Sequence, residues 1–227
     1  MKKSVLAFFC FVSFFSFAQD FDEDETYIDT NYLEDQFYAG LAYNGILNRP
    51  DGVIQRNLSY NLQLGFIKDI PVNEKRNFGF ALGVGYATNS YYTNIQATSN
   101  ENGITYDIPT VSFDRSKLGT HAIEFPIEIR WRTSNAIDYK FWRIYAGGKI
   151  NYNFARTSKF VNENGSDSFT NDDIRQWNYG LMLNFGYNTF NIHLYYELNP
   201  ILKDGVSFNS QENNMNVFRV GLIFYIL

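Results

Sequence analysis

Residues 76–94 read RNFGFALGVGYATNSYYTN, and the side chains in the middle of this stretch alternate in size. A period of two is the period of a β-strand, whose successive side chains point to opposite faces. A half-buried strand of a water-soluble protein normally carries charged side chains on its second face. Here that face is almost bare, so we expect the large side chains to meet an apolar solvent and the small ones an enclosed interior. The large positions are Phe78, Phe80, Leu82, Val84 and Tyr86, and the small ones are Gly79, Ala81, Gly83, Gly85 and Ala87.

The same alternation recurs to the end of the 227-residue chain, which is 45% hydrophobic and 19% aromatic. No segment with a helical period of 3.6 interrupts it, so successive strands should pair as antiparallel neighbours. We expect strands near residues 37–47, 57–69, 77–94, 119–133, 140–155, 174–188, 190–199 and 216–227.

The connections between these strands alternate between two kinds. Those at 48–56, 95–118, 156–173 and 200–215 are long or polar, whereas those at 70–76, 134–139 and 188–190 are short. Outer-membrane barrels combine short periplasmic turns with longer external loops. The sequence therefore predicts an all-β protein: an eight-stranded, antiparallel, up-and-down transmembrane β-barrel over residues 37–227, in the outer membrane of a Gram-negative bacterium and in contact with its lipid. A secreted lipocalin-like barrel is the less favoured alternative, because so many bulky aromatic side chains would not fit inside eight strands.

The N-terminal region has the features of a secretory signal. Residues 1–18 combine Lys2 and Lys3 with an apolar run and a small residue, Ala18, at the expected cleavage site. Residues 19–36 form an acidic leader that we expect in the periplasm; 20–36 hold eight acidic residues and no basic one. The leader is a candidate docking segment for a basic envelope protein. The sequence contains no basic stripe of the kind that nucleic-acid binding requires.

Two ends of the predicted apolar face carry aromatic side chains, as expected for the girdles of a membrane barrel. From Trp177 to Tyr187 the tilted strand would rise by about 25 Å, which matches the height of the apolar band. The girdle residues we expect are Phe78, Tyr86, Trp142, Tyr152, Trp177, Tyr179, Phe185 and Tyr187.

The polar face carries charged residues that would be enclosed by the barrel. Because buried charges must be paired, we expect Glu128 to lie near Arg143, Glu124 near Lys149 and Glu197 near Arg219. The network predicts a lumen plugged by ion pairs and Asn side chains, with a proton or ion path as the alternative. Its members are Glu124, Glu128, Arg130, Arg132, Arg143, Lys149, His193, Glu197 and Arg219.

Sequence signals for enzymatic chemistry are weak. The two histidines, His121 and His193, lie on different predicted strands, and no G-x-S-x-G nucleophile elbow occurs. A catalytic role for His193 beside Glu197 is less favoured than a structural one. The acids within 162–173 could attract calcium, but their spacing is not that of an EF-hand, and we expect a solvated loop. We therefore assign no catalytic residue, cofactor or metal site.

The chain closes with NVFRVGLIFYIL. Arg219, Gly221, Phe224 and Ile226 fit the polar-x-Gly-x-x-aromatic-x-apolar pattern that resembles the signal read by the barrel-assembly machinery. An edge strand with lipid-facing side chains can pair with that machinery before the barrel closes.

The segment HAIEFPIEIRWRTSNAIDYKFWRIYAGGKINY (121–152) and the terminal GLIFYIL together resemble the small outer-membrane β-barrel family of Bacteroidota, called PorT-like or porin-family proteins. The resemblance implies an OmpA/OmpX-like barrel of eight strands, and some relatives belong to the type IX secretion system. We expect a non-enzymatic structural or interaction protein of the envelope. An accessory barrel of a secretion or assembly complex and a narrow pore for ions or small solutes remain alternatives.

Overall fold

The computed structural model of the chain describes residues 35–73, 75–101, 103–133, 142–188, 190–208 and 211–226. All of these belong to one compact unit, residues 31–227. The predicted signal peptide (1–18) and the acidic leader up to residue 34 lie outside the described residues.

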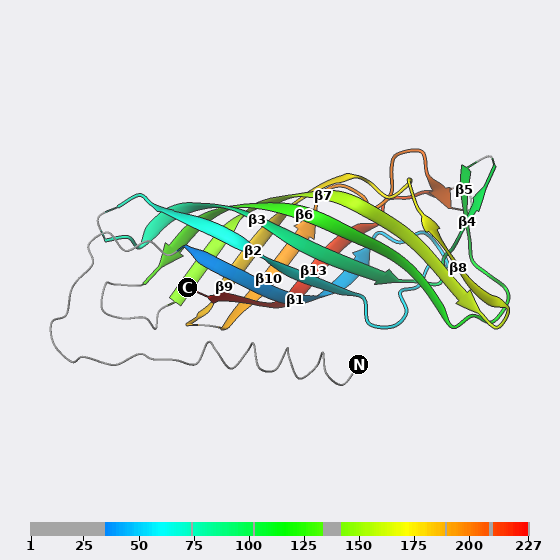
Figure 1. Cartoon of the computed structure of the whole chain (residues 1–227), viewed down its shortest axis with the longest axis horizontal. Coiled ribbons are helices and arrows are strands. Elements are labelled where there is room, and N and C mark those ends of the chain that lie inside the picture. The colour runs from blue at the N-terminus through cyan, green and yellow to red at the C-terminus, as the bar shows by residue number, and fades with distance from the viewer. Residues whose placement is uncertain are drawn as a thin grey trace, which may run out of the picture. The chain divides into compact units, whose positions relative to one another are not determined.

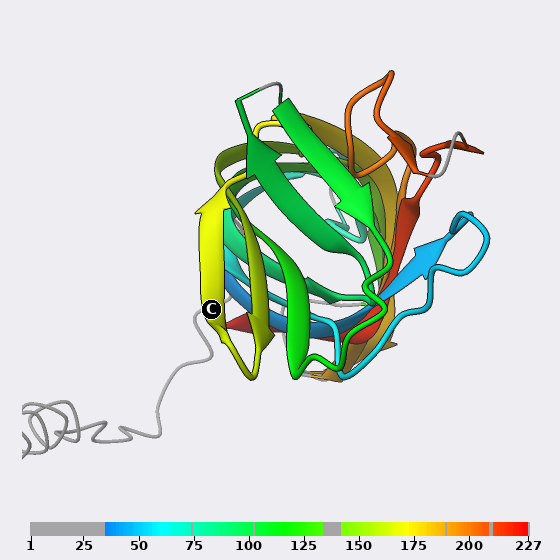
Figure 2. The same cartoon turned by 90° about the vertical axis from the view of Figure 1, so that its right-hand side faces the viewer.

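Eight long strands form the wall of a closed barrel (Figures 1 and 2). Each pairs in antiparallel fashion with the strand before it and the strand after it along the chain, in an up-and-down order. Pairing of β1 with β13, in a register that joins Leu41 to Leu222, closes the ring. The predicted fold is therefore confirmed. Within the described residues these strands are β1 (Gln36–Leu47), β2 (Tyr60–Pro71), β3 (Phe78–Tyr92), β6 (Arg115–Arg132), β7 (Trp142–Asn162), β9 (Trp177–Tyr187), β10 (Phe190–Glu197) and β13 (Asn216–Ile226).

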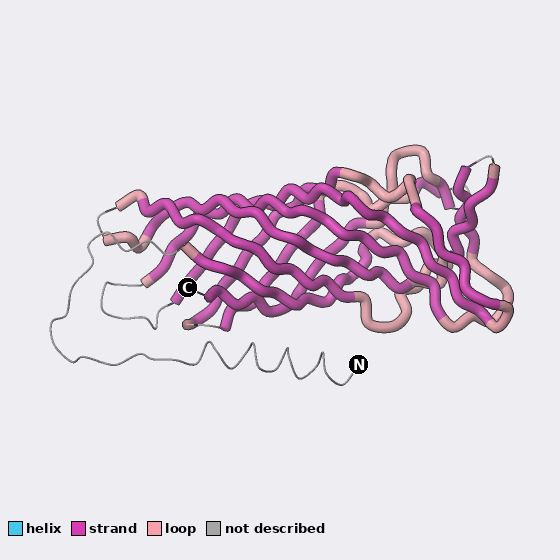
Figure 3. The backbone as a smooth tube through the Cα atoms, in the orientation of Figure 1, coloured by secondary structure: helices cyan, strands magenta, loops and turns pink. Residues whose placement is uncertain are grey.

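Five shorter strands lie in the long connections at one end of the barrel, which we call the loop end (Figure 3). β4 (Gln96–Asn100) pairs with β5 (Gly103–Asp107), and β11 (Ser207–Phe208) pairs with β12 (Gln211–Glu212). β8 (Gly165–Thr170) pairs with the last residues of β7, 157–162. The repeated string NENG closes two of these hairpins, with Gly103 and Gly165 at positive φ angles of 120° and 140°. Asn-Gly pairs favour such reversals. We call the opposite end, where the connections are short, the turn end.

Two strands are longer than the sequence predicts. β6 begins at Arg115 instead of 119, and β7 continues to Asn162 instead of 155. Beyond the register shift at His121/Ala122, residues 115–121 of β6 still pair with 155–161 of β7. The expected solvated loop at 162–173 contains the exposed strand β8. The long polar connection predicted at 156–173 is therefore mostly strand, because 156–162 belong to β7 and Gly165–Thr170 form β8. Its polar composition resembles that of a loop, but its backbone groups are satisfied by neighbouring strands.

Along the strands of the wall, most large apolar side chains face outward and alternate with inward side chains that are mostly small or polar. All three tryptophans are outward, with exposed fractions of 43% for Trp131, 58% for Trp142 and 54% for Trp177. Outward aromatic residues gather at two heights. Phe78, Trp142, Phe185 and Tyr187 lie near the turn end, whereas Tyr86, Tyr152, Trp177 and Tyr179 lie near the loop end.

Aromatic rings of neighbouring strands touch at both heights. The ring centroids of Trp142 and Tyr187 are 5.3 Å apart near the turn end, and those of Tyr152 and Trp177 are 4.8 Å apart near the loop end. Tyr86 is partly covered by His121, whose Nδ1 lies 2.5 Å from the tyrosine hydroxyl. Within the described residues, no helix is long and apolar enough to cross a membrane.

Candidate functional site: the charged lumen and its cap

The inward side chains of the eight strands fill the interior of the barrel, which we call the lumen. Near the turn end, Asp69 accepts hydrogen bonds from Arg130 (Nη1–Oδ1 3.3 Å) and Arg132 (Nη2–Oδ2 2.8 Å). Arg130 also pairs with Glu128 (Nε–Oε2 2.8 Å). These side chains are almost completely inaccessible to solvent. A carboxylate shared by two guanidinium groups compensates charges that burial would otherwise strongly disfavour.

Aromatic rings support these arginines. The guanidinium carbon of Arg130 lies 4.5 Å from the ring centroid of Tyr145 and 5.6 Å from that of Tyr225. The guanidinium carbon of Arg143 also lies near Tyr225, 5.8 Å from its ring centroid. Cation–π contact strengthens when both groups are removed from water, so the rings stabilise the arginines while they fill the cross-section.

The middle of the lumen is crossed by Tyr38. Its hydroxyl donates a hydrogen bond to Glu124 (2.6 Å to Oε1), and Lys149 Nζ lies 3.1 Å from the other oxygen of the same carboxylate. Lys149 also donates to Gln63 Oε1 at 2.5 Å. Each polar atom of Glu124 therefore has a partner, as a buried carboxylate requires.

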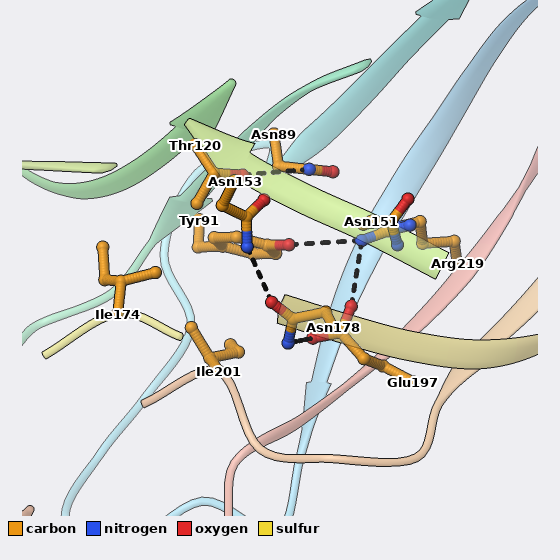
Figure 4. Close-up of a pocket in the computed structure, with 10 residues that line it drawn as sticks. All are labelled: Asn89, Tyr91, Thr120, Asn151, Asn153, Ile174, Asn178, Glu197, Ile201 and Arg219. Atoms are coloured by element: carbon orange, nitrogen blue, oxygen red, sulfur yellow. Dashed lines mark hydrogen bonds and ion pairs between the residues drawn. The ribbon is translucent and has the colours of Figure 1, made fainter. Parts of the chain in front are cut away.

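The third cluster lies toward the loop end and is centred on Arg219 (Figure 4). Arg219 donates to Glu197 (Nη2–Oε2 3.2 Å) and to Asn44 (Nε–Oδ1 3.0 Å), and its guanidinium carbon lies 4.3 Å from the ring centroid of Tyr195. Asn178 donates to the other oxygen of Glu197 at 2.8 Å and accepts from Asn153 at 2.6 Å. The amide side chains thus extend the ion pair into a network that spans several strands.

Little space remains between the clusters. One cavity beside Arg219 and Glu197 and another beside Tyr38 and His193 each have a volume of about 10 Å³. That volume is near the minimum that a single water molecule needs.

Above the third cluster, the loop end has an apolar core of its own, which we call the cap. Tyr106 from β5 extends into it, and its hydroxyl oxygen lies 3.1 Å from both Asn171 Oδ1 and Asp173 Oδ2. Burial, followed by the nearby Asp173 carboxylate, raises the pKa of Tyr106 above its usual value, although the Asn171 hydrogen bond opposes this. The loops of this end are therefore packed against one another. The buried members of the cap are Ile46, Val53, Tyr91, Ile95, Ala97, Tyr106, Leu118, Ile174, Ile201, Leu202, Phe208, Met215 and Val217.

Comparison with known proteins agrees with this architecture. Residues 17–203 match the family described as "Outer membrane protein beta-barrel domain". The chain belongs to this family. The outer-membrane barrel accordingly lies in the outer membrane of a Gram-negative bacterium, with outward side chains in lipid and, by the usual asymmetry of such barrels, its loop end outside the cell. No curated protein has a matching sequence.

Solved structures with a similar course of the chain include Ail, the attachment invasion locus protein of Yersinia pestis. In complex with the heparin analogue sucrose octasulfate, Ail shares 13% identity with the outer-membrane barrel, with a TM-score of 0.40 over 85% of this chain and 97% of that chain. A second Ail structure shares 16% identity, with a TM-score of 0.36 over 84% of this chain and 96% of that chain. A triple mutant of the Rhodopseudomonas blastica porin shares 10% identity, with a TM-score of 0.19 over 86% of this chain and 99% of that chain.

Every residue of the sequence-derived charge network is buried, and two of its three expected pairs are formed. Glu124 contacts Lys149 and Glu197 contacts Arg219, but Glu128 pairs with Arg130 of its own strand and not with Arg143. The register explains the difference, because Arg143 lies opposite Arg132, four positions beyond Glu128. His193 and Glu197, the two residues of the less favoured catalytic alternative, have different partners. His193 bonds to Asn184 (Nδ1–Oδ1 2.6 Å), whereas Glu197 bonds to Arg219 and Asn178.

Sequence reasoning missed Asp69 and two of the lumen tyrosines, Tyr38 and Tyr225. Asp69 continues the polar face of β2 by the same period of two as Asn61 and Gln63, but the predicted strand ended at that residue. Tyr38 and Tyr225 also occupy inward positions, since they alternate with outward Phe37 and Phe224 in the paired strands β1 and β13. A large aromatic residue on the inner face gives no signal by itself, because the same residue type forms the girdles.

Proposed function

We propose that the outer-membrane barrel is a closed, non-enzymatic protein of the envelope that acts through its exposed surfaces and not through its lumen. The observation that carries this proposal is the pairing of lumen charges with one another, from Asp69 at the turn end to Arg219 below the cap. A conducting pore keeps its lining charges in contact with a column of water. Here the charges are covered by tyrosine and asparagine side chains.

A narrow pore for ions or small solutes is the competing function, and conductance separates the two. Purified barrel in a planar bilayer should give no stable conductance steps beyond those of the bare bilayer. Proteoliposomes containing it should not swell in small sugars. A porin reconstituted in parallel supplies the positive control. Stable, uniform steps that scale with the amount of barrel would contradict the closed lumen.

The buried position of His193 supports a structural role and no catalytic one. Its Nδ1 bonds to Asn184, which in turn donates to Glu128 (3.2 Å) and Tyr225 (2.9 Å). A substrate would have to displace the whole cluster to reach the imidazole. His193→Asn should therefore reduce the stability of the barrel and leave any envelope phenotype of the folded protein unchanged.

Two surfaces remain for interaction with other envelope components: the packed loop end and the acidic residues 20–36. A synthetic 20–36 peptide, with a control in which the acids are replaced by their amides, tests the second. Retention of a basic envelope protein by the first peptide alone would support docking. Equal retention by both peptides would contradict it.

An accessory role in a type IX secretion or outer-membrane assembly complex is a second candidate, supported by the resemblance of residues 121–152 to PorT-like proteins of Bacteroidota. Co-purification of the tagged chain from native membranes, in mild detergent, tests this role. Stoichiometric recovery of secretion components would favour it over a solitary barrel.

The last strand supports a further expectation, recognition by the barrel-assembly machinery. β13 closes the barrel by pairing with both β1 and β10, and it carries Phe224 on its outer side, 5.8 Å from the Phe190 ring centroid. Phe224→Ala should slow insertion in cells while refolding into vesicles of the purified chain remains nearly normal. Similar loss in both settings would indicate a purely structural role.

A further inference from the structure

The extended ribbon of β6 and β7 carries two lysines that face each other directly across the strand pair. Lys117 on β6 and Lys159 on β7 are Cα partners in the register. Like charges at directly opposed positions of a sheet are destabilising. Among the described residues, no carboxylate lies within ion-pair distance of Lys117, Lys159 or Arg115, which is two positions further along β6.

These cations lie on the membrane-facing side of the ribbon. Along β6 they share a face with His121 and with lipid-facing Ile123, while the intervening Ser116 and Leu118 are buried. Three of the described acids lie near these cations along the sequence, and none forms an ion pair with them. Asp114 precedes Arg115, Glu163 lies in the exposed turn between β7 and β8, and Asp167 lies opposite the buried Phe160. The positive charge on the outer side is therefore not balanced from within the sheet.

The neighbours of the two lysines complete a row of hydrogen-bond donors. Tyr92 on β3 is the partner of Lys117, and Ser168 on β8 is the partner of Lys159. A tyrosine, two lysines and a serine thus occupy paired positions on the same face of four neighbouring strands. Such groups bind the oxygens of phosphate, the ammonium groups by charge-assisted bonds.

The height of this row identifies the anion. His121 belongs to the aromatic layer near the loop end, with Tyr86 and Phe154 at ring distances of 6.0 and 6.3 Å. Lys117 is four residues further from the membrane centre, which is about 10 Å along the barrel axis for a strand tilted by ~40°. Aromatic belts mark the headgroup level, so the row lies where the phosphates of outer-leaflet lipids begin.

We propose that Lys117 and Lys159, with Tyr92 and Ser168 beside them, bind the phosphate groups of the anionic glycolipid in the outer leaflet. The lipid phosphate neutralises the repulsion between the two lysines and binds the extended β6–β7 ribbon to the membrane surface. Clusters of basic residues next to a membrane-spanning segment recognise anionic headgroups in this way. The inference rests on the outer-membrane location of the barrel and is independent of whether the lumen conducts.

The test compares the full chain with K117Q/K159Q and with K75Q/K203Q, which removes the same charge from exposed loops elsewhere. Each protein is refolded in a neutral detergent and titrated with purified rough lipopolysaccharide or with its dephosphorylated form. Wild type and K75Q/K203Q should bind the phosphorylated lipid alike, whereas K117Q/K159Q should bind it roughly 30-fold more weakly. The dephosphorylated lipid should not distinguish the three.

Thermal unfolding is a second measurement, in which the difference in unfolding temperature between K117Q/K159Q and wild type should change sign when lipid is added. In detergent alone, K117Q/K159Q should unfold at or above the wild-type temperature, because the repulsion is gone. With phosphorylated lipid it should unfold below wild type. Inorganic phosphate at the same phosphorus concentration should reproduce neither effect. Equal lipid binding by the two double variants would overturn the proposal, and so would saturation of the row by inorganic phosphate.

Discussion

The hydroxyl group of Tyr38 occupies the space that a side chain at Gly85 would need. A Cβ atom built on Gly85 would overlap this hydroxyl, and one built on Gly65 of the neighbouring strand would lie 2.6 Å from the tyrosine ring. The absence of a side chain at Gly85 therefore leaves room for the Tyr38 hydroxyl to reach Glu124, which lies opposite Gly85 on β6 (2.6 Å).

The first prediction follows from this close approach. Gly85→Ala should displace Tyr38 and destabilise the barrel by about 1–3 kcal/mol, as overpacking of a filled interior does. Removal of the clashing hydroxyl should relieve part of the strain, so Y38F/G85A should lose less than the sum of the single variants. Urea titration in lipid vesicles, followed by tryptophan fluorescence, measures both effects.

Gly148→Ala is the matched control for this experiment, because the nearest atom to its Cβ would be 3.5 Å away. Equal losses in the free energy of unfolding for G148A and G85A would contradict the explanation, because the loss would then not depend on the contact with Tyr38.

The second prediction concerns Asp69, which two arginines share. Asp69→Asn leaves Arg130 and Arg132 buried with one fewer carboxylate, and we expect a loss of about 3–5 kcal/mol in the free energy of unfolding. The contrast is Asp35→Asn, which removes the partly exposed partner of the exposed Lys68 (2.8 Å) and should cost less than about 1 kcal/mol. Unfolding of both variants in urea gives the comparison, and near-equal losses would show that the lumen pairs contribute no more than a surface pair.

The third prediction is an alkaline weakening of the cap. Because the pKa of Tyr106 is raised, its neutral form is favoured in the folded cap. This contribution is fully present below the unfolded tyrosine pKa of about 10 and is lost as pH rises above it. Cleavage of the outer loops by a protease active at high pH should increase over that range.

Tyr106→Phe supplies the control for the pH series, since it keeps the ring in the cap but cannot ionise. Its cleavage should be faster than wild type at neutral pH, because two hydrogen bonds to Asn171 are gone, and should lack the tyrosine-linked increase. An unchanged alkaline increase in Y106F would assign the effect to another group.

The fourth prediction tests which face meets lipid. Brominated acyl chains should quench the fluorescence of single-tryptophan variants that retain Trp131, Trp142 or Trp177, whereas aqueous iodide should quench them weakly. Outward side chains at the girdle heights are within reach of the bromine atoms. Strong iodide quenching with no effect of brominated lipid would place these rings on a face exposed to water.

The sequence predicted the barrel because the solvent on each side of the wall imposes a pattern with a period of two. Phe78 through Tyr86 had to be large for lipid, and the alternating loop lengths indicated the up-and-down order. Strand ends were less well predicted. The extension of β7 to Asn162 depends on pairing with β6 and β8, and polar strand residues beyond the membrane have the composition of a loop.

Pairing inside the lumen depends on register, which a single sequence does not specify. Glu124–Lys149 was expected from adjacency of two strands, but the partner of Glu128 was wrong because a four-residue offset along the strands separates it from Arg143. The cap was missed for a related reason. Its apolar residues are scattered over four connections and the adjoining ends of β1, β3, β6 and β13, and each connection is polar when considered alone.

The amino-acid sequence by itself determined which side chains face lipid and which are enclosed, because alternation is a local property of an extended chain. Only the tertiary structure decided which enclosed groups meet: that Tyr38 needs Gly85 to be bare, that Asp69 serves two arginines, and that Lys117 faces Lys159. Those contacts depend on how far each strand is shifted against the next when the ring closes, and that shift is fixed by the whole barrel at once.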